Sequence, residues 1–460
     1  MVRDVIRKYL YSFISTEVSR TSRYFDESIQ IDKLPADDGL LFSKVDASKK
    51  SELDRASLPV SQDESPLGRR LILLNGNLNY DLDIQGSLLE LNKKVSRFDR
   101  VACVVYNSYF KWIYQLASLF RLRRGPQPSV FLTRSHLETL SAISGFEIVR
   151  IRPAAYFPFK LFGLGTFINL SCAAMPGIRW LSLTSVIFLR SKPTVKISPK
   201  LSVVIPARNE KGNIENAITR LKPFLDKNPT EIIFVEGHSN DDTWGEIQRV
   251  AEKYKDQYQI NFCQQSGKGK ADAVRLGFSK AQGDLLTILD ADLTMPPELL
   301  HRFYDTYCNG TADFINGSRL VYPMEDDSMR FLNRLGNIFF AKALSFVLDA
   351  TLTDSLCGTK LVSKTDYDRF IKWRNDFGDF DPFGDFELLF PAASMGLGII
   401  DIPIRYESRV YGSTNISRFR HGLVLLKMTF IGLTKIKVCT TNDNQKNKIG
   451  LEVTQGLTQE

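Results

Sequence analysis

The chain has 460 residues, which is too long for one hydrophobic core, so we expect two or three domains. Its composition of 43% hydrophobic and 24% charged residues is typical of soluble globular proteins, and its net charge of +8 suits anionic partners such as nucleotide phosphates, lipid phosphates or nucleic acid. Its six cysteines lie far apart without a CxxC pair, which excludes a zinc site or a disulfide framework and indicates reduced thiols in the cytoplasm.

The first segment, "MVRDVIRKYLYSFIS", is not a signal peptide, because charges interrupt every apolar run. Its apolar residues recur at helical spacing with basic residues between them, which predicts either a helix packed on a domain or a helix on a membrane surface. Residues 161–178 carry no charge and just reach the length of a spanning candidate. Their glycines, proline, asparagine and hydroxyl residues favour a buried or interfacial segment instead.

Residues 33–68 have little apolar periodicity, and we expect a loop there. Strand and helix patterns then alternate up to residue 191. The predicted strands are "RRLILLNG", "RVACVVYN", "FEIVRIRPAAYF" and "WLSLTSVIFLRS", and the predicted helices are "DIQGSLLELNKKVS", "SYFKWIYQLASLF" and "SHLETLSAISG". Thr133 is placed to cap the last of these helices.

The stretches "SLLELNKKVSRFDRVACVVYN" and "HLETLSAISGFEIVRIRP" resemble the carboxy-terminal half of a class I S-adenosylmethionine-dependent methyltransferase. The resemblance covers residues 68–191. Such enzymes approach their cofactor through a glycine-rich turn after the first strand, and no strand followed by GxGxG precedes residue 70. We therefore interpret this half as a truncated, non-catalytic relative that acts as a scaffold or docking surface.

The short, basic and proline-broken stretch "RSKPTVKISPK", residues 190–200, reads as a linker. Beyond it the alternation is sharper and predicts an α/β fold with a mainly parallel sheet covered by helices on both faces. The predicted strands are "KLSVVIPARNE", "TEIIFVEG", "YQINFCQQ" and "DLLTILDAD", and the helices between them are "NIENAITRLKPFLDK", "WGEIQRVAEKY" and "GKADAVRLGFSKAQ".

Polar clusters follow each of these strands. In parallel sheets, ligands bind beyond the carboxyl ends of the strands, so the clusters should converge on one edge. They are Ala207-Arg208-Asn209-Glu210, Glu236-Gly237-His238-Ser239, Gly267-Lys268-Gly269-Lys270 and Asp290-Ala291-Asp292.

Seven motifs in order resemble a family 2 glycosyltransferase with the GT-A fold, in the branch of dolichol- and polyprenyl-phosphate sugar synthases. The resemblance covers residues 200–435 and implies a metal-dependent, inverting transfer of a sugar from a GDP- or UDP-linked donor. The motifs are "VVIPARNE", "FVEGHSNDDT", "GKGKADAVRLGF", "GDLLTILDADLTMPPE", "TDSLCGTKLVSK", "GDFELLF" and "IPIRYESRVYGSTNI".

The departing nucleoside diphosphate develops negative charge, which a divalent cation held by carboxylates can neutralise. Mg²⁺ and Mn²⁺ favour oxygen ligands and typically take one or two protein carboxylates. Asp290 and Asp292 are the expected ligands, and alternation along a strand would point both to the same side. The alternative is that Asp292 only caps the helix that opens at Pro296-Pro297.

By resemblance, Pro206, Arg208, Glu210 and Glu236 line the nucleoside pocket. The glycine turn around Lys268 and Lys270 would bring cations and backbone N–H groups to the diphosphate, with a solvated basic turn as the alternative. Two further candidates for donor binding lie in the following helix, Asp272 and Arg275.

The acceptor decides the remaining chemistry. A hydroxyl acceptor needs a general base, for which Asp385 and Glu387 are the candidates, Asp385 being slightly favoured. A polyprenyl phosphate is already anionic and needs cations instead, which Arg409 supplies. The rest of this expected cradle consists of Ser413, Thr414 and Asn415, extended by Arg418 and Arg420.

Residues 330–354 and 421–438 mix apolar and cationic residues, which fits either helices in a membrane interface or helices that cover the sheet. We expect a cytoplasmic protein, peripheral at the inner face of a membrane. Two competing functions remain, a nucleotidyltransferase of similar fold and a non-catalytic scaffold, while no nucleic-acid module is recognisable. The predicted segments are 1–67 (helix and loop), 68–192 (methyltransferase-like), 193–200 (linker), 201–438 (glycosyltransferase) and 439–460 (polar tail).

Overall fold

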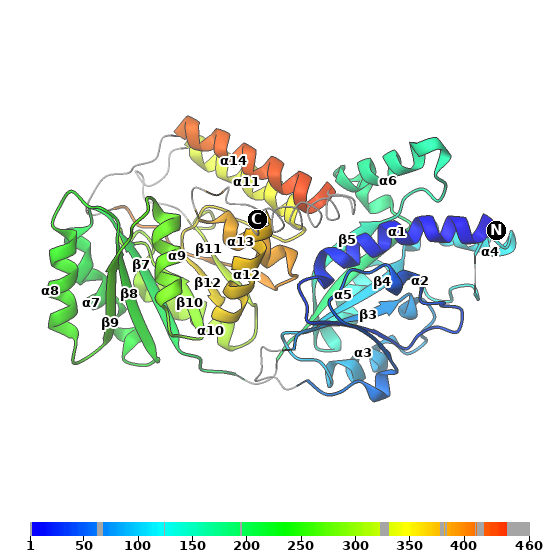
Figure 1. The fold of residues 1–460 in the computed structure, drawn as a ribbon, viewed down its shortest axis with the longest axis horizontal. Coiled ribbons are helices and arrows are strands. Elements are labelled where there is room, and N and C mark those ends of the chain that lie inside the picture. Colours follow the sequence, from blue (N-terminus) through cyan, green and yellow to red (C-terminus); the bar gives the residue numbers. More distant parts are fainter. Residues whose placement is uncertain are drawn as a thin grey trace, which may run out of the picture. The chain divides into compact units, whose positions relative to one another are not determined.

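A computed structural model describes residues 2–61, 68–123, 125–193, 196–322, 331–377, 381, 384–409, 411 and 418–438. The chain divides into two compact units (Figure 1). Unit 1 comprises residues 1–192 and 431–460, and unit 2 comprises residues 193–430. Each unit has a mixed α/β architecture with its own sheet.

Unit 1 begins with a long helix and then alternates strands and helices. Its strands are β1 Glu27–Ile31, β2 Lys50–Leu53, β3 Arg70–Asn75, β4 Arg100–Tyr106, β5 Phe146–Ala154 and β6 Thr184–Ser191. Its helices are α1 Val2–Ser22, α2 Leu40–Ser43, η1 Arg55–Ser57, η2 Asn77–Asn79, α3 Ile84–Asn92, η3 Ser108–Phe110, α4 Lys111–Leu119, α5 Arg134–Ile143, η4 Leu161–Gly163, α6 Leu164–Ala174, η5 Ile178–Leu181 and the π-helical η8 Leu433–Val438.

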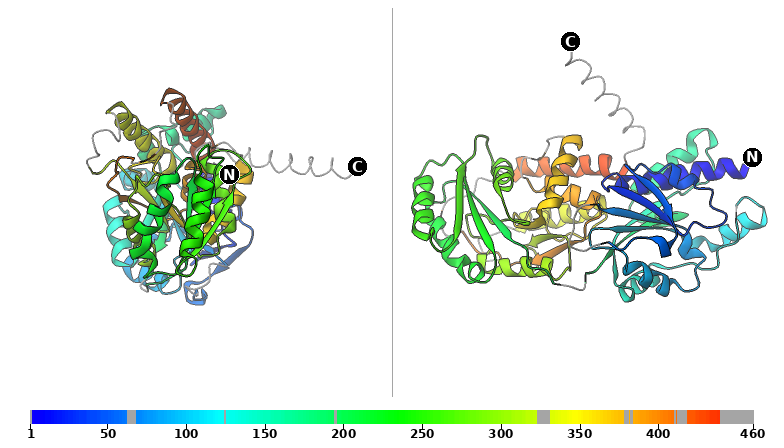
Figure 2. Two further views of the ribbon diagram at one scale, coloured as in Figure 1. Left: turned by 90° about the vertical axis from the view of Figure 1, so that its left-hand side faces the viewer. Right: turned by 60° about the horizontal axis from the view of Figure 1, so that its bottom comes forward.

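The strands of unit 1 form one sheet in the order β2-β1-β3-β4-β6-β5, in which β6 runs antiparallel to both its neighbours. Side chains alternate between the faces of the sheet, so each strand contributes to two cores. Ile72 and Cys103 pack on the side of α3 and α5, whereas Leu73 and Val104 pack on the side of α1 and α2 (Figures 1 and 2).

The strand and helix predictions for residues 69–191 are confirmed, including the cap of α5, where the N–H of His136 donates to Thr133 Oγ1 at 3.3 Å. The prediction of a loop over residues 33–68 was wrong in part. That segment holds α2, β2 and η1, and it is preceded by β1, which the sequence reading missed. Both strands are only four or five residues long, and β1 is buried along nearly its whole length, so no alternating pattern marked it.

Unit 2 follows the predicted alternation closely. Its strands are β7 Leu201–Ala207, β8 Thr230–Glu236, β9 Gln259–Gln264, β10 Leu285–Ile288, β11 Phe314–Ser318, β12 Lys360–Ser363 and β13 Ile399–Pro403. Its helices are η6 Lys211–Asn213, α7 Ile214–Leu225, α8 Thr243–Tyr254, α9 Lys270–Lys280, η7 Pro297–Leu299, α10 Leu300–Cys308, α11 Phe331–Leu348, α12 Lys364–Phe377, α13 Phe386–Ser394 and α14 Arg418–Gly432, whose last residues belong to unit 1.

The sheet of unit 2 has the order β13-β11-β12-β10-β7-β8-β9, and β12 is antiparallel to both its neighbours. The expectation of a mainly parallel sheet is therefore confirmed. Helices α7 and α8 lie on one face of β7–β9 and α9 lies on the other (Figure 1). A glycine makes the second contact close, because a Cβ at Gly277 of α9 would lie 2.3 Å from Val204.

The chain returns to unit 1 after unit 2. Arg20 of α1 donates hydrogen bonds to the carbonyl oxygens of Ile436 at 3.0 Å and Lys437 at 2.8 Å. Unit 2 is thus inserted between two segments of unit 1, and the second unit ends at residue 430 where the sequence suggested 438. Among the described helices, none has the length and apolar character to cross a bilayer.

Candidate active site at the carboxyl edge of the unit 2 sheet

Three neighbouring parallel strands, β10, β7 and β8, end at the same edge of the sheet. The loop after each of them contains one non-glycine residue with a left-handed backbone, namely Leu293 (φ 55°), Asn209 (φ 57°) and His238 (φ 56°). Such conformations cost energy and cluster where function needs a particular loop shape. Three of the four predicted polar clusters lie in these loops, and the fourth, residues 267–270, follows β9, which runs parallel to β8. Their expected convergence on one edge is therefore confirmed.

Asp290 and Asp292 lie in the turn beyond β10, which ends at Ile288. The expectation that strand alternation orients them was therefore wrong, because the backbone has already left the strand. The N–H of Leu293 donates to the carbonyl oxygen of Asp290 at 3.1 Å and closes the turn. Asp292 accepts hydrogen bonds from the N–H of Thr294 at 3.1 Å and from its Oγ1 at 2.8 Å. The residue preceding the helix at Pro297 is Pro296, so Asp292 caps a turn and not that helix.

Asp290 forms an ion pair with Lys270, the first residue of α9. Burial alone would raise the pKa of Asp290, but the charge and hydrogen bond of Lys270 outweigh burial and lower it. Burial likewise opposes the charge on Lys270, yet the charges of Asp290 and Asp385 raise its pKa overall. Both partners are therefore held in their charged forms.

Arg409 bridges Asp292 and Glu210. Its Nη2 lies 2.5 Å from Asp292 Oδ2, and its Nη1 lies 3.3 Å from Glu210 Oε1. Asn213 donates to the other oxygen of Glu210 at 2.7 Å. Burial raises the pKa of Glu210 to about 7, with the negative charges of Asp292 and Asp241 adding to the effect and the Asn213 hydrogen bond and Arg409 opposing it.

Hydrogen bonds join the loop after β7 to the loop after β8. The N–H of Asn209 donates to Ser239 Oγ at 3.0 Å, and the N–H of Asn240 donates to Asn209 Oδ1 at 2.7 Å. Glu236, at the end of β8, accepts from the N–H of Ser239 at 2.6 Å and from Gln264 at 3.1 Å. Burial opposes its ionisation, but these hydrogen bonds prevail and lower the pKa of Glu236.

The other two residues expected at the nucleoside pocket flank this pair of loops. Pro206 is half-buried in β7 and Arg208 is exposed just beyond that strand. All four candidates for the nucleoside pocket therefore lie on two adjoining strand ends.

The basic glycine turn before α9 is only partly open to a ligand. Lys268 is exposed, whereas Lys270 is occupied by Asp290. Asp272 accepts from the N–H of Gly267 at 3.1 Å, so this carboxylate fixes the turn. Gly269 has a φ of 92°, which the turn into α9 requires of a glycine.

Arg275 and Glu387 form a buried pair away from this turn. Nε and Nη2 of Arg275 lie 3.0 and 2.6 Å from Glu387 Oε2, and Glu387 is 5% exposed. Arg374 approaches the same carboxylate at 3.5 Å. The arrangement ties α9 to α13 and leaves Glu387 surrounded by cations.

Asp385 occupies the position before the first residue of α13, so Asp385 and Glu387 do not share a face as they would on a strand. Asp385 accepts from Lys360 Nζ at 2.5 Å, and that lysine is 1% exposed. Lys360 also donates to the carbonyl oxygen of Cys357. Asp385, the preferred candidate for the general base, is thus paired with the buried Lys360, and its charge also acts on Lys270.

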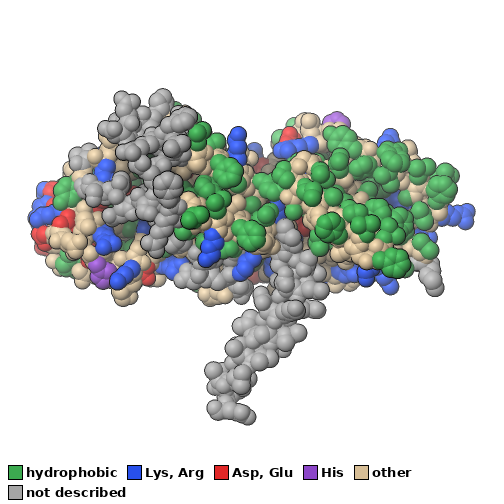
Figure 3. All heavy atoms as spheres, turned by 90° about the horizontal axis from the view of Figure 1, so that it is seen from above, with side chains coloured by type: hydrophobic (Ala, Val, Ile, Leu, Met, Phe, Trp, Pro, Cys, Tyr) green, Lys and Arg blue, Asp and Glu red, His purple; other side chains and the backbone are tan. Residues whose placement is uncertain are grey.

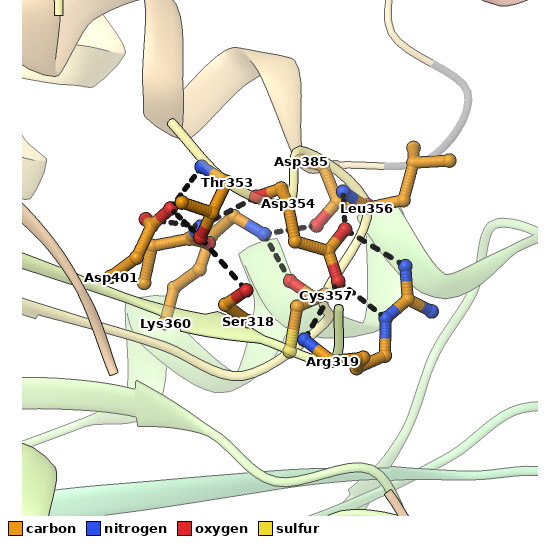
Figure 4. A network of polar contacts seen from close by, with 10 residues as sticks. Ser318, Arg319, Thr353, Asp354, Leu356, Cys357, Lys360, Asp385 and Asp401 are labelled. Atoms are coloured by element: carbon orange, nitrogen blue, oxygen red, sulfur yellow. Dashed lines mark hydrogen bonds and ion pairs between the residues drawn. The ribbon is translucent and has the colours of Figure 1, made fainter. Parts of the chain in front are cut away.

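Residues 353–360 belong to a polar network (Figure 4). The sequence shows these residues within the motif "TDSLCGTKLVSK" but predicts no role for them. Arg319 donates to Asp354 through Nε at 2.7 Å and Nη2 at 2.9 Å, and Asp354 is fully buried. Burial opposes the charge of Asp354, but Arg319 lowers its pKa. Gly358 passes so close to the site that a Cβ would lie 2.2 Å from Lys270 Nζ and 2.3 Å from Asp290 Oδ2.

Through Gly358, the segment that holds this network packs against the ion pair of Lys270 and Asp290. The signal that could have revealed it is the combination of Asp354, Gly358 and Lys360 within seven residues of one motif. Of the remaining expectations, Ser413, Thr414 and Asn415 lie outside the described residues, as do the side chains of Arg418 and Arg420.

Oxygen donors for a divalent cation are present in Asp290 and Asp292. Within the described residues there is no group of three acidic, histidine or cysteine side chains arranged to hold a metal. A cage of that kind is not needed for Mg²⁺ or Mn²⁺, which take one or two carboxylates together with substrate phosphates and water. The donor set therefore fits such an ion, provided that Lys270 or Arg409 turns from its carboxylate to the phosphates.

Comparisons with known proteins agree on one part of the chain. Residues 202–370 match the family described as glycosyl transferase family 2. The chain is 34% identical over 137 residues to a dolichol-phosphate mannosyltransferase of Pyrococcus furiosus, which covers 30% of this chain and 38% of that protein. It is 29% identical over 239 residues to a dolichyl-phosphate hexose transferase of Haloferax volcanii, which covers 52% of this chain and 93% of that protein.

Coverage of the relatives is uneven, because a further match, a glycosyltransferase of Haloferax volcanii, is covered over 35% of its length. A solved structure with similarity is glucosyl-3-phosphoglycerate synthase from Mycobacterium tuberculosis in complex with Mn²⁺, UDP and glucosyl-3-phosphoglycerate. It has 16% sequence identity and a TM-score of 0.38, covering 53% of this chain and 82% of that chain.

Proposed function

We propose that this chain, which carries a glycosyltransferase family 2 domain over residues 202–370, is a hexosyltransferase that moves a sugar from a nucleotide donor to a polyprenyl phosphate. The observation that carries the proposal is the convergence of Asp290, Asp292 and Glu210 with Lys270 and Arg409 at one sheet edge. The names of the relatives, dolichol-phosphate mannosyltransferase and dolichyl-phosphate hexose transferase, point to the same class of acceptor.

The donor binds along the loops after β7, β8 and β10. Glu236, Glu210, Pro206 and the exposed Arg208 surround the nucleoside, and the hydrogen-bonded loops keep that surface in shape before the donor arrives. The exposed Lys268 of the glycine turn faces the diphosphate. GDP and UDP donors are both compatible with these groups.

Asp290 and Asp292 hold Mg²⁺ or Mn²⁺ when the donor is bound. The ion supplies positive charge against the leaving diphosphate. Two cations, Lys270 and Arg409, now balance the carboxylates of Asp290, Asp292 and Glu210. With such an ion held by these carboxylates, Lys270 or Arg409 would be free to turn from its carboxylate and bind a phosphate.

The transfer inverts the anomeric centre. The bond between the anomeric carbon and the donor phosphate oxygen breaks while an acceptor oxygen bonds to the opposite side of that carbon. A phosphate acceptor brings an oxygen that is already ionised, so Arg409 can orient it without a strong base. The pairing of Asp385 with the buried Lys360 supports this choice over a hydroxyl acceptor, because that carboxylate is already engaged by a side chain of the protein.

Unit 1 serves as a non-catalytic, methyltransferase-like scaffold in this proposal. Support comes from its late strands, β5 and β6, which form the antiparallel edge of the sheet, and from the segment after β1, which reads "DKLPADDG" in place of a glycine-rich turn. Gln30 and Asn75, on neighbouring strands, both donate to Asp37 at 2.6 and 2.9 Å. Asp37 thus links side chains at the carboxyl ends of β1 and β3.

The direct test supplies purified protein with radiolabelled UDP- or GDP-sugars, Mn²⁺ and a polyprenyl phosphate in detergent. A labelled lipid product together with nucleoside diphosphate is the expected result. Release of a sugar 1-phosphate would indicate nucleotidyl transfer and contradict the proposal, as would turnover only with a glycan hydroxyl. Calorimetry with S-adenosylmethionine tests the role of unit 1, where we expect no binding.

A further inference from the structure

The segment of unit 1 around α6 has its polar groups inside and its apolar groups outside. Asn169 is 3% exposed, whereas Phe167 on the same helix is 67% exposed and Phe162 just before it is fully exposed. Asn169 accepts from the N–H groups of Tyr156 at 2.5 Å and Phe157 at 3.0 Å, so it holds the preceding loop against the helix. This distribution is the reverse of the usual one for a helix on a protein in water.

Backbone strain keeps the apolar residues outward. Leu161 and Phe162 both adopt positive φ values, 38° and 52°, which are unfavourable for residues with side chains. The loop can close on α6 only because residue 165 is glycine, since a Cβ there would lie 1.8 Å from the carbonyl oxygen of Phe159. The strained backbone at Leu161 and Phe162 therefore places the side chain of Phe162 in solvent.

Helix α1 adds to the same side of unit 1. Tyr9 contacts Thr166 at 3.2 Å and Asn169 at 3.3 Å, which places its face of α1 beside α6. Val5, one turn earlier on that face, is 61% exposed. Figure 3 shows hydrophobic side chains gathered broadly over this part of the molecule, with Lys and Arg around them. We call this the apolar surface, and it comprises Val5, Phe159, Leu161, Phe162, Leu164 and Phe167.

Charge complementarity identifies what covers the apolar surface. The sequence contains no Asp or Glu from residue 148 to residue 192, and exposed cations such as Lys8 and Lys160 lie among the apolar residues. Trp180 is 40% exposed with the guanidinium of Arg179 at 4.9 Å from its ring centroid. Protruding apolar side chains with cations and an amphipathic tryptophan are the features of a surface that enters the headgroup region of an anionic bilayer.

We propose that unit 1 docks the protein on anionic lipid bilayers through the apolar surface, with Phe162 inserted below the headgroups. The inference agrees with the lipid acceptor of the proposed function, but it rests on the surface alone. It gives the half of the chain outside the glycosyltransferase family match a role of its own, namely keeping the enzyme where a lipid substrate is found.

The test measures co-sedimentation of the full chain with vesicles of phosphatidylcholine alone or mixed with phosphatidylglycerol. Wild type should bind the mixed vesicles and release at high salt. Phe162→Asp should weaken binding about tenfold or more, and Lys160→Glu about fivefold. The matched control is Leu82→Asp, since Leu82 is 87% exposed and lies next to α3, on the other face of the sheet. This control should bind like wild type.

A second readout reports insertion directly. Phe162→Trp should bind as wild type does, and its added fluorescence should be quenched by brominated acyl chains. Three outcomes would overturn the proposal: no binding of wild type to mixed vesicles, equal losses in Leu82→Asp and Phe162→Asp, or a dimer that Phe162→Asp dissociates without changing vesicle binding. None of these measurements involves sugar transfer, so failure here and failure of the proposed chemistry are distinguishable.

Discussion

Arg409 lies 2.5 Å from Asp292, so the second aspartate of the Asp-Ala-Asp triplet is neutralised by a residue 117 positions later in the chain. The same guanidinium reaches Glu210 at 3.3 Å. A cation that competes with a metal for Asp292 should weaken metal binding and assist substrate binding at once.

Arg409→Ala should tighten Mn²⁺ binding by about tenfold, because it removes a positive charge beside the metal ligand. Turnover with polyprenyl phosphate should fall on the order of a hundredfold, because the acceptor phosphate loses its cation. Calorimetry with Mn²⁺ and acceptor kinetics check the two effects. Arg409→Lys keeps the positive charge but loses the paired N–H donors of the guanidinium. Mn²⁺ should therefore bind as weakly as it does to wild type, while only part of the turnover should return.

Asp290→Asn and Asp292→Asn should each reduce kcat on the order of a thousandfold at saturating donor, because the leaving diphosphate loses charge compensation. A chelator should abolish wild-type turnover, and Mg²⁺ or Mn²⁺ should restore it. Asp305→Asn is the control, since Asp305 lies on α10 in an exposed pair with Lys196. Undiminished metal-dependent turnover in both triplet variants would refute the site.

The pKa of about 7 for Glu210 predicts a pH-dependent stability. Its pKa is raised above the ordinary value of 4.5, so the folded state binds the proton more tightly than the unfolded state does. The free energy of unfolding should therefore fall as pH rises from 4.5 to 7, by about 2–3 kcal/mol at most, and stay level above that. Denaturant titrations at several pH values should show this slope in wild type and not in Glu210→Gln.

Asp385→Asn distinguishes the two kinds of acceptor chemistry. With a phosphate acceptor we expect a loss of turnover below about tenfold, whereas loss of a general base costs about 10²–10⁴-fold. The variant should also lower Tm, because the buried Lys360 loses its carboxylate partner. Lys360→Met combined with Asp385→Asn removes both charges and should recover much of that stability. A hundredfold loss in the double variant as well would identify Asp385 as a base.

Glu387→Gln should destabilise unit 2 by about 3 kcal/mol, since it leaves Arg275 without its buried carboxylate. The control is Glu252→Gln, which removes an exposed pair with Lys255 and should cost less than about 0.5 kcal/mol. Thermal unfolding of both variants provides the comparison. If Glu387 were the catalytic base, turnover would collapse at temperatures where the variant remains folded.

Periodicity and strand-end position carried most of what the sequence could predict. The strands of unit 2 contain long apolar runs bounded by turn residues, and parallel strands must bring their carboxyl ends to one edge. Short strands such as β1 and β2 carry too few residues for a period to register, so they were missed. Strands β7 to β10 of unit 2 were therefore predicted, whereas β1 and β2 of unit 1 were not.

The partners of individual charges could not be predicted. The ion pair of Lys270 and Asp290 lies against the backbone of Gly358, and Arg409 pairs with Asp292 across more than a hundred residues. Asp385 and Glu387 would share a face on a strand but not on a helix, and the helix that starts at Phe386 separates their directions. Tertiary contacts decide such pairings, and spacing along the chain contains no record of them.

The return of the chain to unit 1 at residue 431 means that two covalent connections join the units, one near residue 193 and one near residue 430. A protease that cuts a single connection would leave a nicked molecule whose pieces still migrate together until a denaturant is added. Expression of residues 1–192 alone would also deprive Arg20 of the carbonyl groups of Ile436 and Lys437. Unit 2, by contrast, is continuous in sequence over residues 193–430, so it is the part that can be excised and grafted.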